Sequence, residues 1–216
     1  QPKLLIRSRR RKAITTDSRH WMHKYHNLIT GLEVFEPEHL WVSDITYIRM
    51  TSEFAYLSLI TDAYSRKIVG FSLRKDLSSE GCVNALQMAL EARSSSPQRL
   101  IHHSDRGSQY CCKEYVELLT ENGIAISMTE NGNPYENALA ERMNGIIKME
   151  FNLYNSQTGF EQTKLMIQRS IDAYNQFRPH GSCDNLTPDQ AHLRDEPLSK
   201  RWKDYRKITN FNKQLV

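Results

Sequence analysis

The sequence contains no hydrophobic run that approaches the roughly 18 residues a membrane-spanning helix needs. Its first residues also lack the apolar core of a secretory signal peptide. With 39% hydrophobic residues, 25% charged residues and a mean hydropathy of -0.63, the chain has the composition of neither a disordered nor a fibrous protein. These absences predict a globular protein of the cytoplasm with no membrane partner.

Cysteine is scarce, with 4 among 216 residues, and no CxxC pair occurs. We therefore expect free thiols in a reducing compartment, with no disulfide framework. Histidines recur every third residue at His20, His23 and His26, but no cysteine pair follows at the spacing of a zinc site. A surface stretch is the simpler interpretation of that pattern.

The net charge of +4 is unevenly distributed. Residues 1–24 hold eight Lys and Arg against one Asp, and residues 200–216 hold six against one, so the middle of the chain is net acidic. Basic ends commonly neutralise nucleic-acid phosphates, while an acidic centre can concentrate carboxylates around a divalent metal. Two solvated tails would give the same arithmetic, so charge alone leaves both interpretations open.

Three runs rich in β-branched and aromatic residues, joined by short polar connections, predict successive antiparallel strands. They cover 41–50, 54–61 and 67–73. The pattern then alternates between helix and strand, which implies parallel pairing with crossovers. The alternating elements are a helix from Ser78 or Ser79 to about Arg93, a strand at 99–104, a helix at 114–121 and a strand at 124–128.

The remaining third of the chain is predicted to be helical after one loop. Residues 129–137 have turn chemistry throughout, and helical spacing returns from Ala138 to about Tyr154. Another helix ends near Arg178, and Thr187 followed by proline is typical of the start of a short final helix.

Three acidic residues stand where a sequence building only a core would not place them. Asp44 lies inside the first predicted strand, and Asp105 ends the strand at 99–104, at the edge where sites gather in open α/β sheets. Glu141 begins a helix, with Asn137 four residues before it. Hard oxygen ligands from separate elements suit Mg²⁺ or Mn²⁺, although each acid alone could equally be solvated or capping.

Five stretches in order carry a family resemblance. They are WVSDITYI (41–48), ITDAYSRKIVGFS (60–72), HHSDRGSQY (102–110), GNPYENALAERMNGIIKMEF (132–151) and YNQFRPH with LTP (174–188). They closely resemble the catalytic part of insertion-sequence transposases of the IS-three family, a group similar to retroviral integrases. The 35 residues between Asp105 and Glu141 match the spacing of that family's acid signature.

The resemblance implies an α/β, ribonuclease-H-like fold, with a five-stranded mixed sheet flanked by helices. It implies that Asp44, Asp105 and Glu141 are catalytic and hold two Mg²⁺ ions when DNA is bound, with Mn²⁺ as a substitute. The implied chemistry is cleavage that frees a 3′ hydroxyl, followed by strand transfer, with no small-molecule cofactor. Double-stranded DNA, as element ends and target, is the implied partner of a homodimer or larger assembly at the bacterial nucleoid.

Neighbouring residues are candidates for DNA contact. Lys148 lies two turns after Glu141 on the same helix face, and similarity to integrases points it at the terminal DNA. Arg142 is a surface or phosphate residue, Asn137 orients Glu141 or the DNA or caps the helix, and Gln109 contacts DNA or shapes the turn after Asp105. An exposed helix lysine is the competing interpretation of Lys148.

Three further residues within the matched stretches have less certain roles. Asp62 closes a turn in the simplest interpretation, and His180 in the RPH motif has no role that the sequence explains. Gly145 inside a helix requires a close backbone approach or nearby DNA.

The chain is predicted to comprise a basic arm at 1–38, an integrase-like core at 39–192 and a basic tail at 193–216. No helix-turn-helix pattern precedes residue 38, so we expect the catalytic core without specific end recognition. A retroelement integrase, a resolving nuclease on the same fold and a non-catalytic DNA-binding fragment are the alternatives. The lack of a zinc module argues against the first, and the presence of all three acids argues against the last.

Overall fold

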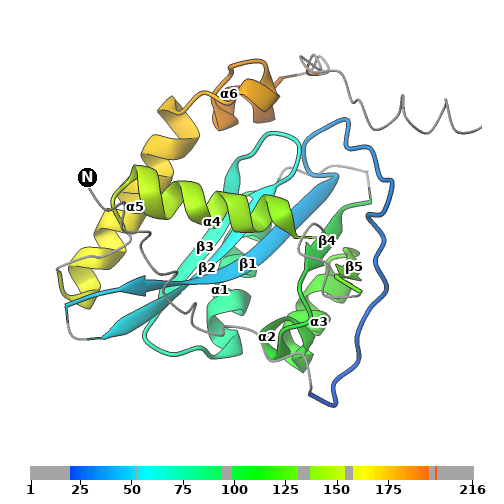
Figure 1. Ribbon diagram of the computed structural model, residues 1–216. Helices are drawn as coiled ribbons and strands as arrows, with labels where there is room; N and C mark the ends of the chain where they lie inside the picture. The colour runs from blue at the N-terminus through cyan, green and yellow to red at the C-terminus, as the bar shows by residue number, and fades with distance from the viewer. Residues whose placement is uncertain are drawn as a thin grey trace, which may run out of the picture.

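The computed structural model contains one mixed sheet with helices on both faces (Figure 1). It describes residues 20–51, 53–93, 99–130, 137–153, 158–194 and 198. The strands are β1 (Leu40–Arg49), β2 (Phe54–Asp62), β3 (Ile68–Arg74), β4 (Ile101–Ser104) and β5 (Ala125–Met128). The helices are α1 (Ser79–Glu91), α2 (Ser108–Cys111), α3 (Lys113–Glu121), α4 (Ala138–Glu150), α5 (Phe160–Phe177) and α6 (Pro188–His192), with a 3₁₀ turn at Gly181–Cys183.

The strand order β3-β2-β1-β4-β5 places β1 at the centre of the sheet. β1 pairs antiparallel with β2, with Asp44 opposite Leu59, and parallel with β4, with Trp41 opposite His102. β3 adds antiparallel to β2, and β5 adds parallel to β4. The hairpins therefore build one half of the sheet, and the helical crossovers build the other, as the sequence pattern predicts.

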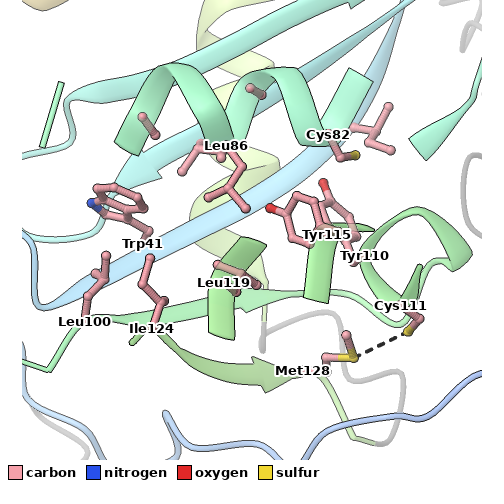
Figure 2. Packing of buried hydrophobic residues seen from close by; sticks show 14 residues of the cluster. Trp41, Cys82, Leu86, Leu100, Tyr110, Cys111, Tyr115, Leu119, Ile124 and Met128 are labelled. Atoms are coloured by element: carbon pink, nitrogen blue, oxygen red, sulfur yellow. Dashed lines mark hydrogen bonds between the residues drawn. The ribbon is translucent and has the colours of Figure 1, made fainter. Parts of the chain in front are cut away.

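Each face of the sheet is covered by its own helices. On one face α1, α2 and α3 enclose a cluster in which Cys82 and Leu86 lie across from Tyr110 and Tyr115 (Figure 2). On the other face α4 and α5 pack over β1, β2 and β3, with Tyr174 fully buried. Because strand side chains alternate between the faces, Trp41 and Ile45 of β1 pack in the first cluster and Ile48 packs in the second.

An extended segment, residues 20–39, runs beside β5 before β1 begins, and we call it the N-terminal strap (Figure 1). The amide of Met128 donates to the carbonyl of His26 at 3.3 Å, and the amide of Leu28 donates to Ser127 Oγ at 2.9 Å. The strap therefore covers an edge of the sheet that would otherwise leave its backbone groups open to another strand.

The element order predicted from sequence is confirmed, with differences at the ends of elements. α4 ends at Glu150, four residues before the predicted end, and Ser108–Cys111 is the short helix α2 where the sequence predicts only a turn. Thr187 caps α6 as predicted, by accepting from Gln190 N in a capping box. The predicted loop at 129–137 falls largely outside the described residues. Within those residues, no helix has the length and apolar composition needed to cross a membrane.

Candidate active site

The central strand carries the first acid toward α4. Leu40 and Val42 pack in a cluster with Ala140 of α4, so the period-two alternation of β1 directs Asp44 and Thr46 to the same face. Asn144 Nδ2 of α4 donates to Asp44 Oδ2 at 2.8 Å. The predicted strand acid is therefore held at the interface between the sheet and this helix.

The other two acids come from elements that meet β1 near the same point. Asp105 follows the end of β4, the parallel neighbour of β1, and its Oδ1 accepts from the amide of Gly107 at 2.9 Å. This hydrogen bond closes the short loop into α2. Glu141 lies in the first turn of α4, with its side chain exposed.

The negative charges of Asp105 and Glu141 affect the titration of Asp44. Burial and then the nearby charges of Asp105 and Glu141 raise the pKa of Asp44 from 3.8 to about 7, against the hydrogen bond from Asn144, which lowers it. The charges of Asp105 and Glu141 therefore act on Asp44, although the sequence places the three acids 61 and 36 residues apart.

This donor set is suited to a hard divalent cation. Three carboxylates that repel one another are stabilised by a positive ion, and Mg²⁺ prefers oxygen ligands. Two amide oxygens at the same interface, Asn137 Oδ1 and Asn144 Oδ1, are buried and have no hydrogen-bond partner among the described residues. Among the described residues, no three acidic, imidazole or thiol side chains lie close enough together to form a metal-binding cluster.

Two asparagines attach α4 to β1. Asn137 occupies the N-cap position without capping the helix through its side chain. Instead its Nδ2 donates to the carbonyl of Ser43 at 3.0 Å, so the capping interpretation is wrong and Asn137 positions the helix that carries Glu141. The role of Asn144 was not predicted, although its spacing of three residues from Glu141 was a usable signal.

Lys148 continues the same row of contacts. Its Nζ donates to Thr46 Oγ1 at 3.1 Å and lies 4.4 Å from the ring centroid of Tyr47. The lysine therefore faces the sheet beside the acids and is not a freely solvated helix residue. Cation–π contact and the hydroxyl hold its charge at that position.

The two remaining DNA-contact candidates lie elsewhere. Arg142 is exposed, and its charge is among those that lower the pKa of His180, so it lies toward the RPH motif. Gln109 is buried, and its Nε2 donates to the carbonyl of Leu77 at 3.1 Å. This hydrogen bond connects α2 to the loop before α1, which gives Gln109 a structural role. Little of its side chain is exposed for contact with DNA.

The RPH motif joins the ends of α4 and α5. Arg178 donates to both carboxylate oxygens of Glu150, at 2.5 and 2.6 Å, and to His180 Nε2 at 3.1 Å. The His180 ring meets Tyr174 edge to face with centroids 5.3 Å apart. Burial, followed by the charge of Arg178, lowers the pKa of His180 to about 4, so it accepts the hydrogen bond as a neutral ring.

Asp62 closes a turn, as predicted. Its fully buried carboxylate accepts from the amides of Glu38, Tyr64 and Ser65 and from the Ser65 hydroxyl. The Ser65 hydroxyl also shares a hydrogen bond of 3.0 Å with His192 Nδ1 of α6. This network anchors α6 to the turn between β2 and β3.

The sheet order and the placement of the acids define a ribonuclease-H-like core of the retroviral integrase type. Solved integrase structures have the same fold. A simian T-cell lymphotropic virus intasome chain matches with a TM-score of 0.64 and 22% identity, over 88% of this chain and 66% of that one. The HTLV-2 integrase catalytic core in complex with magnesium matches with a TM-score of 0.55 and 24% identity, over 73% and 97%.

Sequence relatives narrow this class to a family. Two models of the integrase core domain match residues 36–134 and 122–188. An IS600 protein of 31 kDa from Shigella sonnei is 33% identical over 188 residues, covering 86% of this chain and 69% of the relative. Transposase InsF for IS3A of Escherichia coli K12 is 33% identical over 155 residues, covering 71% of this chain and 54% of the relative.

The chain therefore belongs to the insertion-sequence transposases of the IS-three family, which contain an integrase core domain. It spans about half the length of several curated relatives, including InsF and the Shigella sonnei IS629 transposase, of which it covers 54% and 52%.

Proposed function

We propose that this chain is the catalytic core of a DNA transposase that cuts a phosphodiester bond at the end of an insertion sequence and transfers the freed 3′ end to another strand. Family membership supports this proposal, and the geometry that carries it is the placement of Asp44 on β1, Asp105 after the parallel neighbour β4, and Glu141 in the first turn of α4, whose Asn144 bonds Asp44. The core is taken as residues 39–192, with basic arms at 1–38 and 193–216.

Asp44, Asp105 and Glu141 would hold Mg²⁺, with Mn²⁺ as a substitute and two ions when DNA is bound. When bound, such ions activate the attacking oxygen and stabilise the leaving 3′ oxygen. Asn144 orients the Asp44 carboxylate through its 2.8 Å hydrogen bond. Asn137 fixes the start of the helix that presents Glu141.

Lys148 and Arg142 would contact DNA from two sides of α4. Lys148 already lies beside the acids, so the terminal phosphate is the group it would reach first. Arg142 is exposed and available to phosphates farther from the cut. A homodimer or larger assembly on DNA is part of the proposal, because two element ends must be brought together for joining.

Charge-neutral replacement of single acids tests the catalytic assignment. Asp105→Asn and Glu141→Gln should each reduce Mg²⁺-dependent cutting and joining of an oligonucleotide duplex by at least about 100-fold, because each removes a negative ligand and leaves the side-chain size unchanged. Asp172→Asn, an exposed acid on α5, is the matched control and should retain full activity.

Two measurements separate the alternatives. Calorimetry should show Mn²⁺ binding to the unaltered chain and its loss in Asp105→Asn. Cutting without joining would favour a resolving nuclease over a transposase. Activity equal to that of the unaltered chain in both acid variants would refute the proposal.

A further inference from the structure

Trp21 is the most exposed large hydrophobic side chain among the described residues, at 94%. An indole in water forgoes a large area of apolar burial, although exposed aromatics do occur singly. Exposure alone therefore assigns no role to Trp21, and the contacts of the neighbouring residues are needed.

Both neighbours of Trp21 are attached to the body of the protein. His20 Nε2 donates to the carbonyl of Arg106 at 2.9 Å, and Met22 packs against the cluster under α1 and α3. Tyr25 packs against the same cluster, three residues farther along the strap. The backbone at Trp21 is thus held on either side, while its ring alone extends into solvent.

The attachment point lies beside the proposed active site. Arg106 directly follows Asp105, whose carboxylate organises the same loop. Figure 1 shows the strap, in dark blue, beginning close to α2, the helix that this loop leads into. The backbone that carries Trp21 is therefore attached to the loop that directly follows Asp105.

Two cations belong to the segments that meet near Trp21: Lys24 lies three residues later in the strap, and the carbonyl of Arg106 accepts the hydrogen bond from His20. Lys24 and Arg106 both act on the thiol of Cys111, where their charges oppose the burial that raises its pKa to about 11. The two cations therefore flank one residue of α2. An exposed aromatic ring on a segment that also carries basic side chains suits a nucleotide, whose base can stack while its phosphate pairs with the cations.

From this arrangement we infer that Trp21 stacks on an unpaired base of the DNA next to the cut, with Lys24 and Arg106 near the adjoining phosphates. A ring cannot stack on a base inside an intact duplex, so the ligand is a base that is extruded or lies in a single-stranded extension. The inference rests on the proposed function, because it assumes that DNA occupies the acidic site.

Two oligonucleotide probes test the inference with the full chain. One is a blunt 20-bp duplex, and the other is the same duplex with a three-nucleotide single-stranded extension containing 2-aminopurine. Trp21→Ala should weaken binding of the extended duplex by about tenfold and abolish quenching of the 2-aminopurine, while binding of the blunt duplex stays within twofold. Trp21→Phe, which keeps an aromatic ring, should retain most of the affinity for the extended duplex and most of the 2-aminopurine quenching.

Phe35 provides the matched control, because it is also an exposed aromatic of the strap, at 60%, but lies near the other end. Phe35→Ala should bind both duplexes as the unaltered chain does. Equal weakening of both probes in Trp21→Ala, no weakening, or the same loss in Phe35→Ala would each overturn the inference.

The unaltered chain separates this inference from the proposed function. If it cuts DNA with Mg²⁺ but shows neither preference for the extension nor 2-aminopurine quenching, base stacking alone is refuted. If it binds neither duplex, the proposed function fails as well.

Discussion

Replacing Gly145 by alanine should stabilise the free protein and impair its action on DNA. Gly145 lies inside α4, one turn after Glu141, and a Cβ added there meets no atom within 4 Å apart from the helix's own backbone. Glycine in a helix interior is less favourable than alanine by about 0.8–1 kcal/mol. With no clash to offset this gain, the free energy of unfolding should rise by about 1 kcal/mol and the melting temperature by roughly 2–4 °C.

The same methyl group should obstruct DNA. The structure excludes one of the two explanations for a glycine at this position. Among the described residues, no backbone or side chain of another element lies within 4 Å of an added Cβ. DNA near the face that carries Glu141 remains, so Gly145→Ala should reduce strand joining several-fold. Urea unfolding and oligonucleotide joining should be measured on the same preparation. The first should show the gain in stability, and the second should show the loss of joining.

Gly70→Ala is the contrasting control. A Cβ on Gly70 would overlap the carbonyl oxygen of Ala85 and lie 2.9 Å from Ala89 Cβ, because β3 and α1 pack closely there. This variant should lose several kcal/mol of stability, of order 3 or more, or fail to fold. A loss of stability in Gly145→Ala would refute the assignment of open space, and unchanged joining in a stabilised variant would refute the assignment of DNA proximity.

Two further predictions concern buried or paired groups. Burial lowers the pKa of His102 to about 3. Below pH 6.5 the unfolded chain therefore binds a proton at this histidine that the folded protein does not bind. The free energy of unfolding should fall by about 1.4 kcal/mol per pH unit from pH 6.5 toward 3. In urea titrations the slope should be smaller by about 1.4 kcal/mol per pH unit in His102→Gln and unchanged in the exposed His23→Gln, while the lowered pKa of His180 still contributes to it. Arg178→Lys should cost about 1 kcal/mol through loss of its two-point contact with Glu150, whereas Lys113→Ala, which breaks an exposed helix pair, should cost under about 0.5.

Local patterns were sufficient to predict the strands and the elements on which the three acids lie. The alternation around Asp44 is visible in the sequence, because apolar Val42 and Ile48 share its parity along β1. Asp105 follows a strand, and Glu141 begins a strongly periodic helix. These signals depend on residues close in sequence, and the fold preserves them.

Contacts between distant segments could not be predicted in this way. The alternating exposure of the strap arises because it lies along β5, about 100 residues later in sequence, and its own composition has no clear period. α2 is only four residues long and begins at a glycine N-cap, so turn chemistry masks it. The RPH motif acquires its role only when Glu150 and Arg178 meet across 28 residues.

The position of Glu141 follows from how α4 is attached to one strand. Asn137, Asn144 and Lys148 are spaced so that they lie along one side of the helix, and they bond Ser43, Asp44 and Thr46 in turn along β1. A slip of α4 along the strand would break all three hydrogen bonds, each contributing about 0.5–1.5 kcal/mol.

β1 itself is held from its other face, where the Ser43 hydroxyl donates to the Tyr110 hydroxyl at 3.1 Å, inside the cluster of Figure 2. Ser43 thus contacts α4 through its carbonyl and α2 through its side chain, one residue before Asp44. α2 also begins directly after the loop of Asp105. Ser43 therefore links the strand that carries Asp44 both to the helix that carries Glu141 and to the helix that follows Asp105, so contacts from several elements balance the repulsion that Asp105 and Glu141 exert on Asp44.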